Sequence, residues 1–160
     1  MTATATQGSR LPGLVLAVLA LAACGGAGSV PPPASPEAAV RGFLDAVHAN
    51  SLSRMSELWG SERGRARTYM KRDELEQRLT VIRTYLQYEK FEMLESQGVP
   101  AATGNQRTVR VRLERNGCTP VVPFTVVPYG GGWLVSNIDL AQAGNPRRRC
   151  GANKPPGTGR

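Results

Sequence analysis

The sequence predicts an α+β domain over residues 36–140, with three N-terminal helices packed on one face of a four-stranded, mostly antiparallel sheet. Three observations indicate this fold class. Apolar residues recur at helical spacing as far as Leu86, alternate with polar residues from Tyr88 onward, and are interrupted by Gly- and Pro-rich turns. Helices followed by a run of strands form two layers around a core. About 105 residues suffice for one such core.

The three helices are predicted from caps and apolar faces. Ser35 is a favourable N-cap and Pro36 suits a first helical turn, so the first helix is expected to start there. A short second helix is predicted over 52–59, and a third from Asp73. The first helix has its apolar residues at i, i+3, i+4 and i+7: Val40, Phe43, Leu44 and Val47.

Four strands are expected from alternating patterns, over 88–96, 108–114, 121–127 and 133–140. Pro123 has no N–H to donate, which indicates a sheet edge, a strand end or a bulge in the third strand. The Tyr129-Gly130-Gly131-Gly132 stretch predicts a hairpin turn before the last strand.

The N-terminus is typical of an export signal. A positive Arg10 precedes an apolar run over 14–23, which is too short to span a membrane and ends in small residues. Leu21-Ala22-Ala23-Cys24 resembles the lipobox of bacterial lipoproteins, in which the cysteine is acylated and the chain is cleaved just before it. This resemblance implies a signal peptide over 1–23 and a lipid anchor on Cys24. Gly25 in place of an aspartate favours the outer membrane or cell surface in a two-membrane organism.

The remaining segments are a Gly/Pro/Ala-rich linker over 24–35 and a basic tail over 141–160, expected to be flexible. The net charge of +8 is mostly in the tail, which has five basic residues and no acidic one. The domain holds 14 basic and 12 acidic residues, so no nucleic-acid partner is expected. Cys118 and Cys150 are left as a pair, and an exported chain predicts a disulfide between them.

The order and spacing of the elements resemble the nuclear-transport-factor-2-like superfamily, in particular its small bacterial lipoproteins of unknown function. The segments that carry the resemblance are the opening helix 36–47, the short helix near 52–59 and the last hairpin, Gly132 to Ile138. The resemblance implies a cone, in which a curved sheet wraps around helices, often with an internal pocket and often dimeric. It implies no single activity, because the superfamily includes isomerases, dehydratases, polyketide cyclases and non-enzymatic modules.

Catalytic and ligand-binding candidates are few. His48 with Asp45 three residues earlier is a weak general-base candidate, but a histidine at the border of the apolar helix face, near the helix end, is the favoured interpretation. A single histidine and no cysteine at ligand spacing predict no metal and no cofactor. Six residues are pocket candidates, although most such residues in proteins are simply core: Phe43, Val47, Trp59, Tyr85, Trp133 and Asn137.

The densest charge on the domain is a basic cluster that either binds anionic head groups, together with the arginines at 147–149, or serves solubility. Its members are Arg63, Arg65, Arg67, Lys71 and Arg72. The favoured hypothesis is a non-enzymatic, membrane-tethered accessory module that binds a small apolar ligand or an envelope protein. The alternatives are an isomerase- or cyclase-type enzyme that uses the cone pocket, and an envelope assembly protein that binds a partner through its sheet. Each of these three hypotheses is compatible with a homodimer.

Overall fold

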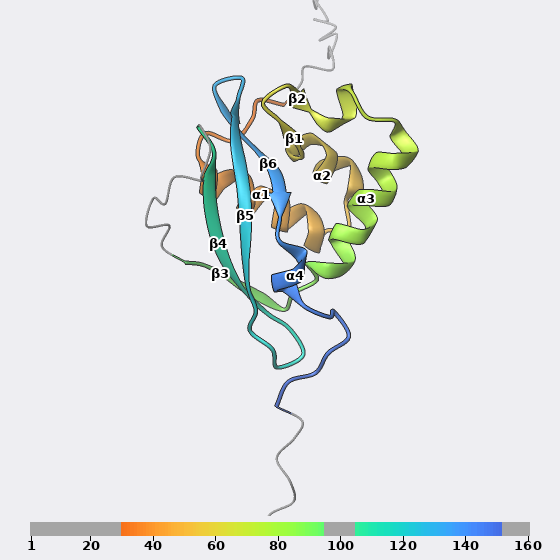
Figure 1. Cartoon of the computed structure of the whole chain (residues 1–160), viewed down its shortest axis with the longest axis vertical. Coiled ribbons are helices and arrows are strands. Elements are labelled where there is room, and N and C mark those ends of the chain that lie inside the picture. The colour runs from red at the N-terminus through yellow and green to blue at the C-terminus, as the bar shows by residue number, and fades with distance from the viewer. Residues whose placement is uncertain (1–29, 95–104, 152–160) are drawn as a thin grey trace, which may run out of the picture.

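The structure, a computed structural model, describes residues 30–94 and 105–151 of the 160-residue chain. Its elements, in chain order, are α1 (Pro36–His48), α2 (Leu52–Leu58), β1 (Gly60–Ser61), β2 (Gly64–Arg65), the 3-10 helix η1 (Ala66–Thr68), α3 (Arg72–Tyr85), β3 (Lys90–Met93), β4 (Arg107–Glu114), β5 (Val121–Tyr129), β6 (Gly132–Ile138) and α4 (Leu140–Ala143). Helices α1 to α3 lie on one side of the main sheet (Figure 1).

Side-chain caps fix the starts of the first two helices. The Ser35 Oγ accepts a hydrogen bond from the Ala38 N–H at 3.1 Å, and the Ser51 Oγ accepts one from the Arg54 N–H at 3.3 Å. Each serine thereby satisfies one of the amide groups that a helix start leaves unpaired. The short link between the two helices contains Asn50 at a φ of 54°, a conformation that asparagine tolerates better than most residues.

Helix α3 begins one residue before the predicted Asp73 and has no side-chain cap. Its exposed face carries two i,i+4 ion pairs, Arg72 with Glu76 and Glu74 with Arg78. Such pairs stabilise a helix weakly, so the helix depends mainly on burial of its apolar face. The buried residues of that face are Leu75, Leu79 and Ile82.

The main sheet is antiparallel throughout and has the order β3-β4-β5-β6. The predicted α+β class with a four-stranded antiparallel sheet is therefore confirmed. The first strand is shorter than the predicted 88–96, and the last two residues of that range lie outside the described residues. The third strand is longer than expected and runs on to Tyr129.

Pro123 lies in an interior strand, because β5 is paired with β4 on one side and β6 on the other. The edge placement was therefore wrong, and Pro123 is the third residue of β5 rather than its end, two residues before the register shift at Thr125/Val126. Pairing with β6 stops beside Pro123, whose carbonyl accepts a hydrogen bond from the Asp139 N–H at 3.0 Å. The turn from β5 to β6 has positive φ at Gly130 and Gly131, 55° and 80°. Two such residues define the type I′ turn that suits a tight hairpin.

A second, two-stranded sheet formed by β1 and β2 interrupts what the sequence indicated as a polar connection. It packs against the β5–β6 hairpin through two glycines. A Cβ on Gly64 would lie 3.2 Å from the Tyr129 ring, and one on Gly60 would lie 2.9 Å from a Leu134 methyl. Glycine at these positions permits the close approach of the small sheet.

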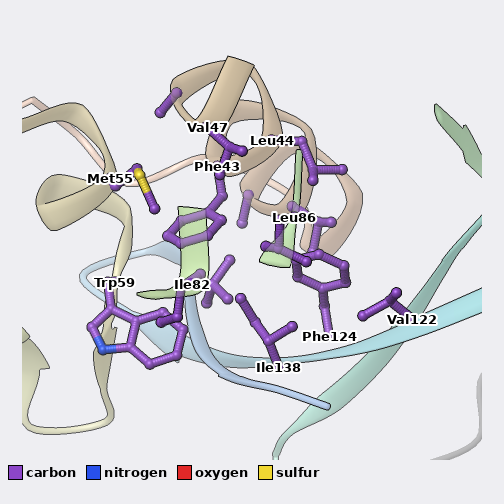
Figure 2. Packing of buried hydrophobic residues seen from close by; sticks show 14 of the residues in the cluster. Phe43, Leu44, Val47, Met55, Trp59, Ile82, Leu86, Val122, Phe124 and Ile138 are labelled. Atoms are coloured by element: carbon purple, nitrogen blue, oxygen red, sulfur yellow. The ribbon is translucent and has the colours of Figure 1, made fainter. Parts of the chain in front are cut away.

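The core fills the space between the helices and the sheet (Figure 2). Phe43 from α1 and Phe124 from β5 are fully buried, and the Phe43 and Trp59 ring centroids are 5.8 Å apart. The core also extends past Leu140, the expected end of the domain, because Ala143 in α4 is buried. The first segment of the predicted tail is thus part of the packed structure.

Candidate functional site

Residues 30–33, here called the strap, lie against the edge of β6. The Trp133 N–H donates a hydrogen bond to the Pro33 carbonyl at 2.8 Å. The strap can bind there because β6 is the last strand of its sheet, and an edge strand presents unpaired backbone groups. Three consecutive prolines, Pro31 to Pro33, restrict the strap to extended conformations and lower the entropy lost on docking.

Gly132 makes the approach of the strap possible. A Cβ at this position would lie 2.7 Å from the Pro32 carbonyl oxygen and closer still to that of Pro33. Both obstructing atoms belong to the backbone, so neither can rotate away. A side chain at position 132 is therefore incompatible with the docked strap.

A buried arginine holds the other end of the strap. Arg65, only 5% exposed, donates from Nη2 to the Val30 carbonyl and from Nε to the Glu57 carbonyl at 2.9 Å. The carboxylate of Glu57 supplies the counter-charge: its Oε2 lies 3.6 Å from Arg65 Nε, and its Oε1 pairs with Arg67 Nη1. Arg65 thereby links the strap to helix α2.

A cleft of about 520 Å³ lies under the strap, between it and helices α1 and α2. Its volume is in the range of small-molecule sites. Apolar atoms form most of its wall, and Arg54 and Glu57 are the charged residues that line it. The other lining residues are Val30, Pro31, Pro33, Ala38, Gly42 and Leu58.

The exposed basic residues near the strap form a smaller group than the sequence indicated. Arg65 is buried, Arg67 pairs with Glu57, and Arg72 pairs with Glu76. Of the five residues in the predicted basic cluster, only Arg63 and Lys71 are exposed and have no ion pair to another described residue.

Tyr69 completes this surface. The Arg63 guanidinium lies 4.7 Å from the centroid of the Tyr69 ring, and the Tyr69 hydroxyl donates to the Ser61 Oγ at 3.2 Å. The ring is 41% exposed, unusual among the large apolar or aromatic side chains of this domain. We call Arg63, Tyr69 and Lys71 the basic loop surface.

The arginines at 147–149 lie at the opposite end of the molecule from β1 and β2 (Figure 1). The combined basic surface considered from the sequence is therefore not formed. This end is held by the disulfide between Cys118 and Cys150, whose Cα atoms are 4.9 Å apart. The Cys150 N–H also donates to the Asn116 carbonyl at 3.0 Å, so the expected pair of cysteines fixes the start of the tail to the β4–β5 turn.

Arg115 is a second buried arginine, 5% exposed, which sequence reasoning missed. It donates to the carbonyls of Tyr85 at the end of α3 and Ala143 at the end of α4, and to Gly144 at 3.4 Å. These carbonyls are among those that helix ends leave unpaired. Burial lowers the pKa of Arg115. Its hydrogen bonds to these carbonyls explain why the fold can accommodate a buried guanidinium group. Its role is structural.

The catalytic candidates His48 and Asp45 are both exposed on α1. The His48 ring lies 5.2 Å from the ring of Tyr88, whose hydroxyl donates to the Leu44 carbonyl at 3.3 Å. Burial raises the pKa of Tyr88, and the nearby charge of Asp45 raises it further. The pair thus faces solvent, and the His48 ring lies beside an aromatic ring.

The six pocket candidates do not surround one cavity. Phe43 and Val47 are fully buried core residues. Trp59 and Asn137 line a separate cleft of about 480 Å³ between α3 and the end of β6. Tyr85 and Trp133 are half-buried, and their backbones make hydrogen bonds. The Tyr85 carbonyl accepts one from Arg115, and the Trp133 N–H donates one to the Pro33 carbonyl of the strap.

Cys24, the predicted signal peptide and the first part of the predicted linker lie outside the described residues. Within 30–94 and 105–151, every helix is too short or too polar to cross a bilayer. The same ranges hold no group of three or more His, Cys, Asp or Glu side chains placed to bind a metal. Comparisons with protein-family models, with curated proteins and with solved structures found no match to this chain.

Proposed function

We propose that this protein is an exported lipoprotein, anchored through an acylated Cys24, whose domain acts as a non-enzymatic accessory or binding module of the cell envelope. The observation that carries the proposal is the combination of the Leu21-Ala22-Ala23-Cys24 motif with a strap that docks on the domain only six residues later. Acylation by two or three chains gives stable membrane attachment, which a single chain does not.

Two features of the domain support this function. The Cys118–Cys150 disulfide agrees with an oxidising, extracytoplasmic compartment. The interior is occupied by packed side chains such as Phe43 and Val47, which favours binding at the surface or in the cleft under the strap. The isomerase or cyclase alternative requires His48 inside a cavity, and its exposure counts against that alternative.

We also propose that the fold is a nuclear-transport-factor-2-like cone. The helices precede a fully antiparallel sheet and cover one of its faces, as in that superfamily. Because such folds serve many functions, this assignment concerns the architecture of the domain and does not indicate an activity.

Acyl labelling in a bacterial host tests the anchor. Cells producing the full chain are grown with an alkyne-tagged fatty acid, and the membrane fraction is probed for labelled protein. We expect the wild-type chain to carry the label and to sediment with membranes, and Cys24→Ser to carry none. Equal labelling of both chains, or none of either while a known lipoprotein in the same cells is labelled, would overturn the proposal.

A further inference from the structure

The strap leaves the domain at the same end as the basic loop surface. Arg65 joins the two, because it belongs to β2 and donates to the Val30 carbonyl. In Figure 1 the described chain begins beside β2, and the start of α3 lies at that end too. The arginines at 147–149 lie at the other end. The two basic regions are therefore at very different distances from the point where the chain leads back to Cys24.

The length of the tether decides which end faces a membrane. Val30 follows Cys24 by six residue positions, and a fully extended chain of that length reaches at most about 20 Å. A compact domain of this size has a radius of gyration of about 13 Å and is roughly 35 Å across. An anchored Cys24 therefore cannot reach a bilayer that lies against the far end while the strap stays docked.

The end that faces the membrane has the composition that anionic head groups attract. Residues 54–72 contain six basic and two acidic side chains, but Arg65 is buried, Arg67 and Arg72 are ion-paired, and the exposed Asp73 follows directly. Arg63 and Lys71 are exposed there, and Tyr69 places an amphipathic ring between solvent and the domain. Guanidinium and ammonium groups pair with lipid phosphates, and tyrosine favours the interface between water and hydrocarbon.

We propose that the basic loop surface rests on anionic phospholipid head groups and sets the orientation of the tethered domain. The inference rests on the proposed anchor at Cys24. Tethering keeps the surface at high effective concentration near the bilayer, so contacts too weak to recruit a free protein are sufficient to orient a tethered one. In this orientation the disulfide end of the domain points away from the membrane.

The orientation is tested on a chain of residues 24–160 coupled through the Cys24 thiol to a maleimide lipid in vesicles, so that the result does not depend on acylation in cells. The buried core lies wholly within residues 39–143 and is retained in this chain. Tyr69→Trp adds a fluorophore to the basic loop surface, and Arg148→Trp adds one at the far end as the matched control. Brominated phospholipids quench a tryptophan that touches the bilayer, and the signal of the unsubstituted chain, which contains Trp59 and Trp133, is subtracted from that of each variant.

We expect the added tryptophan at position 69 to be quenched in vesicles of phosphatidylglycerol and phosphatidylcholine, and the one at 148 to be unaffected. Adding Arg63→Glu and Lys71→Glu should lower the ratio of docked to undocked domains at least about tenfold. Equal quenching at both positions, or quenching at 69 that is as strong on pure phosphatidylcholine, would overturn the orientation. Failure of acyl labelling in cells would instead overturn the anchor and leave this result standing.

Discussion

Replacing Gly132 by alanine should release the strap while the rest of the domain stays folded. The added methyl would lie 2.7 Å from the Pro32 carbonyl oxygen, well inside normal contact distance, and the obstructing atoms belong to the backbone. The strap must therefore move away from β6. The Trp133 N–H then loses its bond to the Pro33 carbonyl, and the Arg65 guanidinium loses its bond to the Val30 carbonyl.

The size of the effect follows from these two bonds. A backbone hydrogen bond contributes about 0.5–1.5 kcal/mol to stability and one from a charged group about 1.5–3 kcal/mol. Alanine recovers about 0.4–1 kcal/mol by restricting the unfolded chain, since Gly132 does not need a positive φ. We expect a net loss of about 1–4 kcal/mol, which affects mainly the strap and its contacts.

Amide hydrogen exchange measures the release directly. In Gly132→Ala, the protection of the Trp133 amide should fall at least about tenfold, which corresponds to about 1.4 kcal/mol. Gly131→Ala is the matched control, because a Cβ at position 131 would meet no atom within 4 Å and so would not obstruct the strap. The φ of Gly131 is 80°, which an alanine adopts only with strain. The control should destabilise the hairpin by about 1–2 kcal/mol through its left-handed backbone and leave the strap docked. Unchanged protection of the Trp133 amide in Gly132→Ala would refute the docking.

Three further predictions concern the disulfide, the buried Arg115 and the pH dependence of stability. Cys118→Ser removes a disulfide with a sequence separation of 32 and should lower the free energy of unfolding by about 3–4 kcal/mol in urea titrations; a loss below about 1 kcal/mol would show that the bridge constrains little. Arg115→Met should lower the free energy of unfolding by about 2–4 kcal/mol, because buried helix-end carbonyls lose their hydrogen-bond donor. The control Arg110→Met, at an exposed position, should change it by less than about 0.5 kcal/mol. Equal effects of the two substitutions would contradict a structural role for the buried Arg115. The raised pKa of Tyr88 means that the folded state holds its proton more tightly than the unfolded state, so its contribution is complete below about pH 10 and is lost as the pH rises through the folded pKa. The free energy of unfolding, measured against pH above about pH 10, should therefore fall less steeply in Tyr88→Phe than in the wild-type chain, and by an intermediate amount in Asp45→Asn. An unchanged slope in Tyr88→Phe would exclude Tyr88 as the cause of the loss of stability.

The α+β class followed from the sequence because burial on one face leaves a periodic signal. Helix α1 alternates buried and exposed positions at helical spacing, and β4 alternates along Val109, Val111 and Leu113. The Ser35 cap and the glycines of the β5–β6 turn are local signals of the same kind. Each of these features depends on a few neighbouring residues, so the sequence contains enough information to predict it.

The features that position the strap depend on contacts between distant residues and leave no local pattern. Arg65 and Arg115 are charged, so the sequence favours their exposure, and only the folded chain brings the carbonyls of Val30 and Ala143 to them. The strands of β1 and β2 have two residues each, which is too short for a period to be detected. The role of Gly132 likewise depends on a segment a hundred residues earlier.

The central claim is that the chain is held at a membrane through an acylated Cys24 close to its docked strap. An intact mass spectrum of the protein purified from the membranes of a producing bacterium tests it most directly. The account predicts a chain that begins at Cys24 and carries a diacylglyceryl group, with the mass reduced by two hydrogens for the Cys118–Cys150 bridge. A mass for a chain that begins elsewhere, or for an unmodified Cys24, would contradict it.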